Sequence, residues 1–387
     1  MLMCGFTKRM SEPLITLHVR ELSSGGPHLL AKQPEIHGVR GGYDIRSLKN
    51  SMIMQIRESF VLLYRSHDRT GFVSLVDWLS GEVLMVRLAS CSRVLRLVYL
   101  RLQDQEFPDY TSATFLDSSH LIMMHKCSII EQAIRLDIDM FRIEFTEQAP
   151  TSSALLKHIR TFEILPFPPN YDVSDIACWC DVRGPIKPLD NPFSSSEASN
   201  AVTIHFDIHT TTDLANLHDH CSLIFPRNTL YSTEHNLHEE LLDVDAPLRL
   251  PWSKWKDKGV VWRVGDTTQS YHRPTVSIDR CLIRRKTSRS QLSVVDINPL
   301  RSRKLGEVNP ADVQHMIGKV KEYFGMSTDA DCGHQLPHRI LNIMELPTSF
   351  YGWSMIDEER ILYQTPTRVS AYANYCSGVL FTCSSVG

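Results

Sequence analysis

Histidine and aspartate residues alternate in one short segment of the chain. His205, Asp207 and His209 are two residues apart, so on a β-strand all three side chains point to the same face. Imidazole and carboxylate groups gathered in this way could bind Zn²⁺ or another transition metal. A second polar group follows shortly afterwards, formed by His218, Asp219, His220 and Cys221. A metal-dependent hydrolase is the enzymatic function that this segment favours.

The alternative interpretation is an exposed strand face followed by a polar loop. The chain contains 17 His residues, so histidines come close together by chance, and the spacing matches no common zinc motif. Cys178 and Cys180 flank Trp179, a spacing typical of a single strand and too short for a zinc or redox loop. His238 lacks the second His that a zincin helix carries four residues later. The sequence therefore predicts no catalytic residue, cofactor or metal ion, and the hydrolase is kept as the alternative.

Five basic residues lie within ten positions, and they could bind phosphates or act as a nuclear import signal. The alternative is a solvated hairpin loop between two strands. Few aromatic residues separate the cations, which argues against binding of single-stranded nucleic acid. The basic residues are Arg280, Arg284, Arg285, Lys286 and Arg289.

A short sequence pattern that occurs twice indicates what kind of secondary structure the chain contains. Leu116-Asp117-Ser118-Ser119-His120-Leu121-Ile122 has the same order of residue types as Ile356-Asp357-Glu358-Glu359-Arg360-Ile361-Leu362. In each copy an Asp-led turn separates two apolar runs, which is typical of a hairpin in a repeated β unit. We expect Asp117 and Asp357 to accept backbone N–H bonds in tight turns, because Asp does this readily where the chain reverses.

Strand patterns dominate the rest of the chain. Residues 72–76 and 83–86 are separated by Ser80-Gly81 and predict a hairpin. One helix is expected near 310–324, because Asn309 can cap it, Pro310 suits its first position and Gly325 suits its end. Its apolar stripe is expected to face the β core. Further strands are expected at 94–102, 113–115, 121–124, 201–208, 222–225, 260–262 and 292–295.

The composition is that of an ordinary globular protein. Of 387 residues, 42% are hydrophobic and 22% are charged, and the net charge is −3. This charge argues against a dominant role at nucleic acids or membrane surfaces. The ten Cys are scattered and no signal peptide or membrane-spanning run is present. We therefore expect reduced thiols and an intracellular location, in the cytoplasm or the nucleus.

Several phrases together resemble the large β-propeller-like F-box proteins of mushroom-forming (basidiomycete) fungi, over roughly residues 70–365. The phrases are Val76-Asp77-Trp78 through Gly81-Glu82-Val83-Leu84; Phe115-Leu116-Asp117 with Leu121-Ile122; Leu250-Pro251-Trp252-Ser253-Lys254-Trp255; Val294-Val295-Asp296-Ile297-Asn298-Pro299-Leu300-Arg301; and Met355-Ile356-Asp357-Glu358-Glu359-Arg360-Ile361. The resemblance implies a WD-repeat-like recognition domain that selects a protein target for a ubiquitin ligase. It also implies a helical F-box that binds a Skp-type adaptor, but residues 1–60 carry no amphipathic helical pattern.

The expected fold is therefore all-β, a β-propeller-like repeat of short antiparallel strands with about seven blades at about 40–50 residues each. We expect residues 1–60 to form an irregular N-terminal segment without a clear F-box. Residues 61–387 are expected to form the propeller-like domain, with long loops near 166–200. The expected function is a non-enzymatic protein-interaction module, related to ubiquitin ligase adaptors, that binds an unknown protein target.

Overall fold

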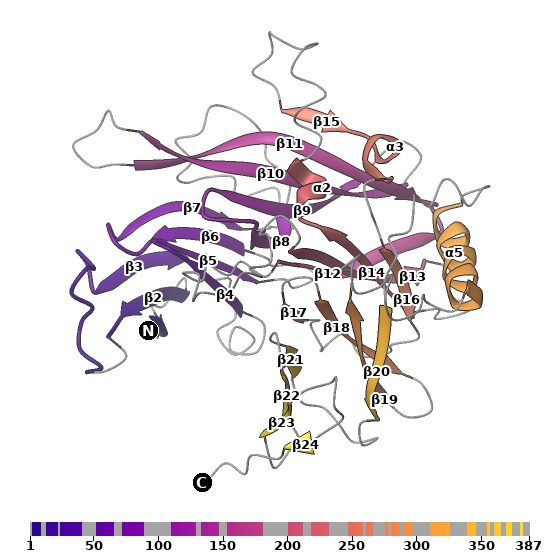
Figure 1. Cartoon of the computed structure of the whole chain (residues 1–387). Helices are drawn as coiled ribbons and strands as arrows, with labels where there is room; N and C mark the ends of the chain where they lie inside the picture. The colour runs from indigo at the N-terminus through magenta and orange to yellow at the C-terminus, as the bar shows by residue number, and fades with distance from the viewer. Residues whose placement is uncertain are drawn as a thin grey trace. The chain divides into compact units, whose positions relative to one another are not determined.

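The described residues fold mostly into antiparallel β-strands, as Figure 1 shows. The structure is a computed structural model, and it describes residues 2–8, 13–21, 24–40, 52–65, 72–88, 110–128, 133–146, 153–180, 200–211, 218–231, 247–257, 261–265, 275–277, 280–286, 290–296, 310–325, 339–345, 354–356, 360–364, 369–373 and 380–381. These residues confirm the all-β prediction. They form six antiparallel sheets, and no closed propeller is found among them.

Two sheets lie wholly within the first of two compact units, which comprises residues 1–127, 136–162 and 246–249. The first sheet has three strands, β1 (Leu2–Lys8), β2 (Pro13–Val19) and β3 (Glu35–Arg40). The second has four, β4 (Met52–Arg57), β5 (Phe60–Arg65), β6 (Phe72–Asp77) and β7 (Glu82–Leu88).

A five-stranded sheet follows, in the order β15-β11-β10-β9-β8. Its strands are β8 (Tyr110–Phe115), β9 (His120–Ser128), β10 (Ile134–Thr146), β11 (Ser153–Phe167) and β15 (Leu248–Leu250). Leu136, Ile138 and Met140 of β10 are buried, and so are Asp137 and Asp139, which alternate with them.

Three four-stranded sheets lie in the second unit, which comprises residues 128–135, 163–245 and 250–387. Each of these sheets is built from strands in chain order. Two short helices, α2 (Asn228–Tyr231) and α3 (Trp252–Trp255), lie between the third and fourth strands of the first sheet. The strands are β12 (Tyr171–Cys180), β13 (Ala201–Thr210), β14 (His218–Pro226) and β16 (Val261–Gly265); β17 (Thr275–Ser277), β18 (Arg280–Lys286), β19 (Ser290–Asp296) and β20 (Arg339–Glu345); and β21 (Ser354–Ile356), β22 (Arg360–Gln364), β23 (Val369–Ala373) and β24 (Leu380–Phe381).

Each copy of the repeated sequence pattern lies between two paired antiparallel strands, although the registers of the two pairs differ by one residue. The first copy joins β8 to β9, where Phe115 pairs with Leu121, and the second joins β21 to β22, where Ile356 pairs with Ile361. Each hairpin links the first two strands of its meander. The Oδ1 atom of Asp117 accepts bonds from the N–H groups of Ser119 at 2.7 Å and His120 at 2.8 Å, as predicted. Leu116 and Leu121 are buried, whereas Asp357 lies outside the described residues.

The predicted helix is confirmed as α5 (Pro310–Phe324), and Gly325 ends it with a φ of +63°. Its last turn packs on an aromatic core in the second unit. The ring centroid of Phe324 lies 5.2 Å from that of Trp262 and 4.5 Å from that of Phe167. Trp252 and Trp255 on α3 are buried against the same group of rings. The tryptophans of this unit thus stabilise the packing between helices and sheet.

Three expectations about boundaries need correction. The N-terminal 60 residues are not irregular, because β1, β2, β3 and β4 lie there, and β4 pairs with β5 across the expected boundary at residue 60. The expected loop near 166–200 begins later, since β11 continues to Phe167 and β12 spans 171–180. Pro166 sits in β11 near its end, where a missing N–H group is tolerated. Residues 181–199 and the strand expected at 94–102 lie outside the described residues.

Candidate functional site

The alternating histidine segment forms strand β13, and its three polar residues share one face as predicted. His205 and Asp207 are each only 1% exposed, and His209 is half-buried. The interpretation as an exposed strand face is therefore wrong. His218, Asp219, His220 and Cys221 are also not a loop, because they begin strand β14, which pairs with β13.

The buried residues of β13 are bonded to side chains of β14. The Nδ1 atom of His205 lies 2.7 Å from the Ser222 hydroxyl, and the Nδ1 atom of His220 lies 2.6 Å from Oδ1 of Asp207. The two imidazole rings stack with centroids 5.4 Å apart. Burial, reinforced by the nearby His220, holds the pKa of His205 well below its usual range. His205 is therefore a neutral, buried side chain.

The remaining polar residues of this segment point elsewhere. His209 pairs with Asp172 on β12, with 3.7 Å between Nε2 and Oδ2. Asp219 pairs with Lys319 on α5 at 3.3 Å. Burial raises the pKa of Cys221 well above its usual range, so its thiol stays protonated. The segment does not gather His205, Asp207 and His209 around one open position, which a hydrolytic metal would require.

A second polar network, which the sequence analysis missed, lies in the first unit on β9, β10 and β11. Its centre is Asp139, which is almost fully buried. The Oδ1 atom of Asp139 accepts a 2.6 Å bond from the Thr161 hydroxyl and lies 3.2 Å from Nε2 of His158. Its Oδ2 atom lies 3.2 Å from Nε2 of His125. Both carboxylate oxygens are thus paired, as a buried charge requires.

These contacts decide where the histidine protons lie. The Nε2 atom of His158 faces the Asp139 carboxylate and the Arg160 carbonyl at 3.1 Å, which are both acceptors. The Nε2 atom of His125 also faces Asp139. We assign a proton to Nε2 of each ring from this hydrogen-bond network. The Nδ1 atom of His125 faces the side chain of Cys127 instead.

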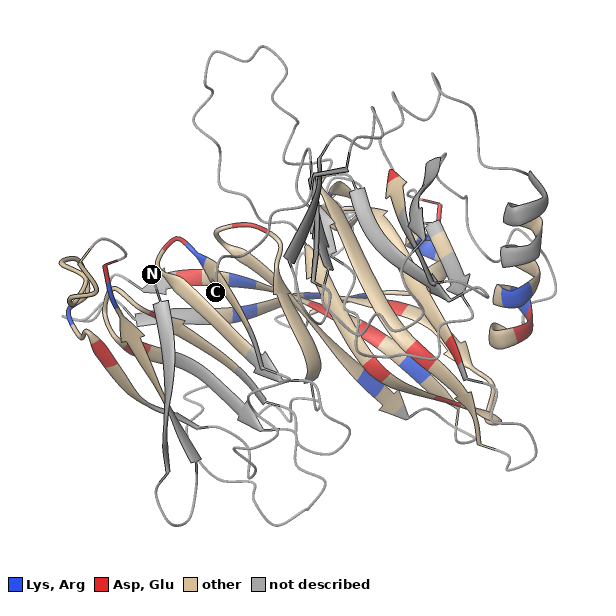
Figure 2. Ribbon diagram, turned by 90° about the horizontal axis from the view of Figure 1, so that it is seen from below, with Lys and Arg blue, Asp and Glu red and all other residues tan. Residues whose placement is uncertain are grey.

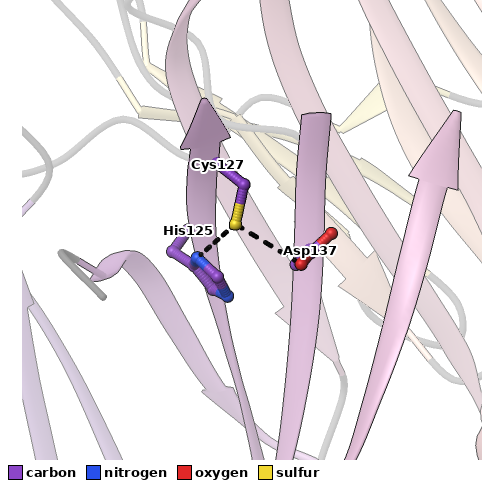
Figure 3. Close-up of side chains that lie close together, drawn as sticks. All are labelled: His125, Cys127 and Asp137. Atoms are coloured by element: carbon purple, nitrogen blue, oxygen red, sulfur yellow. Dashed lines mark hydrogen bonds between the residues drawn. The ribbon is translucent and has the colours of Figure 1, made fainter. Parts of the chain in front are cut away.

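The Nδ1 atom of His125 belongs to a cluster of three converging side chains, drawn in Figure 3. The sulfur of Cys127 lies 3.3 Å from Nδ1 of His125 and 3.4 Å from Oδ2 of Asp137. His125 and Asp137 are buried, whereas Cys127 is half-buried. The Arg249 guanidinium donates a 2.7 Å bond to Oδ2 of Asp137 from β15. Three potential ligand atoms thus lie within 4.8 Å of one another.

A signal for this cluster does exist in the sequence. Asp137 and Asp139 alternate with aliphatic residues in a run that reads as a strand with one polar face. His125 and Cys127 show the same two-residue spacing just before it. Adjacent antiparallel strands bring two such faces together. The pairing of these strands, which decides the contact, is not visible in the spacing of any single segment.

Two other regions carry charged side chains. Four residues of the basic run, Arg280, Arg284, Arg285 and Lys286, lie on strand β18 rather than in a loop. A pocket of about 460 Å³ in the second unit is lined by Trp252, Lys256 and the ion pair of Arg135 with Glu163, whose charged atoms are 3.2 Å apart. Figure 2 shows acidic and basic residues interspersed along the described strands.

No protein-family model matches the chain, and no curated protein matches its sequence. Among the described residues, no helix has the length and apolar character needed to cross a membrane.

Proposed function

We propose that the chain is a non-enzymatic protein-interaction module, of the kind that selects targets in the fungal F-box proteins that it resembles. One observation carries the proposal. All the large hydrophobic side chains that are exposed in the described part of the chain lie between residues 29 and 56. Such side chains, when they occur close together on ordered elements, are typical of protein-binding surfaces.

The first pair, Leu29 and Leu30, lies in the connection between β2 and β3, with exposed fractions of 89% and 68%. Hydrogen bonds fix this turn, because the Leu30 and Ala31 N–H groups donate to the side chain and the carbonyl of His28. The ring of His28 in turn contacts Trp78 edge-on, at 5.1 Å between centroids. A fixed turn loses little conformational entropy when a partner binds its leucines.

The second pair, Met54 and Ile56, lies on β4 with exposed fractions of 37% and 49%. Between them Gln55 turns the other way, and its Oε1 atom accepts bonds from the Thr114 hydroxyl at 3.0 Å and the Phe115 N–H at 3.1 Å. Gln55 is thus used inside the unit while Met54 and Ile56 face solvent. This inverted pattern supports a partner that covers β4.

Affinity capture tests the proposal. We expect the unmodified chain to retain a specific protein from an extract of the source organism. The double substitutions Leu29→Ser with Leu30→Ser, or Met54→Ser with Ile56→Thr, should reduce its recovery at least tenfold, measured by quantitative mass spectrometry. Lys32→Ser is the matched control, because Lys32 is exposed in the same connection. A set of captured proteins that is the same for all variants would refute the proposal.

A further inference from the structure

We propose that His125, Cys127 and Asp137 bind a single Zn²⁺ ion, with Asp139 as the residue that positions His125. The site is independent of the proposed interaction surface. Its three ligand atoms, Nδ1 of His125, Sγ of Cys127 and a carboxylate oxygen of Asp137, lie within 4.8 Å of one another in the first unit. Figure 3 shows that the three side chains point toward one another from β9 and β10.

The distances are close to those of a zinc site. In a tetrahedral site with Zn–S near about 2.3 Å and Zn–N near about 2.0–2.1 Å, the sulfur and nitrogen are about 3.5 Å apart. The Cys127 sulfur lies 3.3 Å from the His125 nitrogen and 3.4 Å from the Asp137 oxygen. The sulfur therefore needs to move by only a few tenths of an ångström relative to each of these atoms. Side-chain rotation would bring the His125 nitrogen and the Asp137 oxygen, which lie within 4.8 Å of each other, onto the ion.

The donor set selects zinc among the common divalent ions. A thiolate, an imidazole and a carboxylate match the borderline-soft character of Zn²⁺, whereas Mg²⁺ and Ca²⁺ require oxygen ligands. Binding replaces the thiol proton of Cys127, which is released to solvent as the sulfur becomes a thiolate ligand. Three protein ligands leave a fourth position for water.

A histidine that binds zinc usually donates its other ring N–H to a carboxylate, and Asp139 provides that carboxylate for His125. Asp139 holds Nε2 of His125 at 3.2 Å, which turns Nδ1 toward Cys127 and fixes the plane of the ring. Asp139 is itself held by Thr161 and His158. The network described above therefore orients His125 with Nδ1 facing the other two proposed ligands.

Arg249 provides the competing positive charge. Its guanidinium donates to the same Asp137 oxygen that would bind zinc, at 2.7 Å, but its side chain is 54% exposed and can move into solvent. Asp137 itself is fully buried. Cys127 and Arg249 are the accessible members of the cluster, so the ion can enter past them. We therefore expect Arg249→Met, which keeps the apolar stem and removes the charge, to increase zinc affinity severalfold.

Zinc titration of the full chain tests the proposal. The protein is freed of metal with a chelator and titrated with Zn²⁺ against a chromophoric competitor. We expect one ion per chain, an affinity at least 100-fold lower for Cys127→Ser, and an unchanged affinity for Cys180→Ser, the control for a half-buried thiol elsewhere. Asp139→Asn should lower affinity by about 10–100-fold. A structural role alone would lower its metal-free stability and leave its zinc affinity unchanged.

Cobalt provides a spectroscopic readout that can be recorded on the unmodified chain. Co²⁺ bound to the unmodified chain should show the intense visible bands of tetrahedral coordination and a near-ultraviolet sulfur-to-cobalt band. The sulfur band should be absent in Cys127→Ser, and Mg²⁺ should not compete. Zinc affinity that is unchanged in Cys127→Ser, or a cobalt complex of the unmodified chain without the sulfur band, would overturn the proposal.

Discussion

Asp139 is a charged residue whose surroundings control its proton. Burial raises the pKa of its carboxyl group, but hydrogen bonds and charge from His125 and His158 lower it more, and the net pKa lies well below the usual range. In the unfolded chain an Asp titrates near about 3.9. As pH falls through this value, the unfolded state binds a proton before the folded state does. The stability that Asp139 contributes is therefore fully present above about pH 4 and is lost below it.

Asp139→Asn should reduce this acid dependence. The amide cannot ionise, so the free energy of unfolding should change less between pH 4 and pH 2.5 than in the unmodified chain. At pH 7 the variant should be less stable, because the amide loses the charge that pairs with the histidines. Urea denaturation at a series of pH values measures both effects. Parallel pH profiles for the two proteins would contradict the assignment of Asp139 as a buried, paired carboxylate.

The lowered pKa of His205 predicts that stability also depends on pH in a second, higher range. Its folded pKa is lowered by burial and by His220, whereas a histidine of the unfolded chain titrates near about 6.5. Below about pH 6.5 the unfolded state takes up the proton that the folded state resists, so stability falls as pH falls from this value. His205→Gln removes the titrating group and should flatten the stability profile between pH 5 and pH 6.5. Denaturation midpoints in that range measure the change, and an unaltered slope would count against a neutral His205.

The two polar networks show which features of a site can be predicted from residue spacing alone. The two-residue spacing of His205, Asp207 and His209 was sufficient to place them on one strand face. It could not show that this face is buried, because burial depends on the packing of strands that are distant in sequence. His125 and Asp139 carried a similar spacing, but their contact depends on the pairing of β9 with β10.

At the scale of the element, α5 agrees with the sequence at both ends. Pro310 begins it and Gly325 follows it, because proline suits the first turn and glycine adopts the positive φ that ends a helix. The hairpin of β6 and β7 was predicted for a similar reason, since Gly81 has a φ of +81° at its turn. The N-terminal strands β1 to β3 were missed. Gly25-Gly26-Pro27 and Gly41-Gly42 suggested irregular structure there, but tertiary pairing overrode that local signal.

The buried face of α5 allows a graded prediction. Val320, Tyr323 and Phe324 are buried, whereas Ile317 is only half-buried. Phe324→Ala should lower the free energy of unfolding by about 3–5 kcal/mol, because the ring contacts Trp262 and Phe167. Ile317→Ala should cost less than the about 2–5 kcal/mol of a fully buried isoleucine. Chemical denaturation of both variants measures the difference, and a larger loss for Ile317→Ala would show that another face of the helix is buried.

At the scale of the whole molecule, consecutive sheets pack on one another within each unit. In the first unit β3 contacts β7, and β8 contacts β4, β5 and β6. In the second, β17 contacts β12 and β13, and β21 contacts β17 and β18. Within each unit, successive sheets of the chain therefore contact one another, and the described residues form no closed propeller.

The same architecture predicts how the chain behaves toward a Skp-type adaptor. An F-box binds its Skp-type adaptor through a compact set of helices. Within residues 1–60, the described segments 2–8, 13–19, 35–40 and 52–57 are strands, and residues 24–34 form turns and bends between two of them. These strands pair with one another or with β5, so their backbone groups are already used in sheets. Converting them into helices would break two sheets of the first unit.

We therefore expect no binding between the purified chain and a Skp-type adaptor from a mushroom-forming fungus. Size-exclusion chromatography of the mixture should show two separate components, and the same chain with a helical F-box fused before residue 1 should co-elute with the adaptor as a positive control. Deletion of residues 1–60 is a poor test, because it would remove β1 to β4 and expose the faces that they cover. Hydrogen exchange is more informative, since it reports on the intact chain. Stable co-elution of the unmodified chain, with adaptor-dependent protection within residues 1–60, would mean that this segment binds the adaptor, and a role as ligase adaptor would then replace the interaction module that we propose.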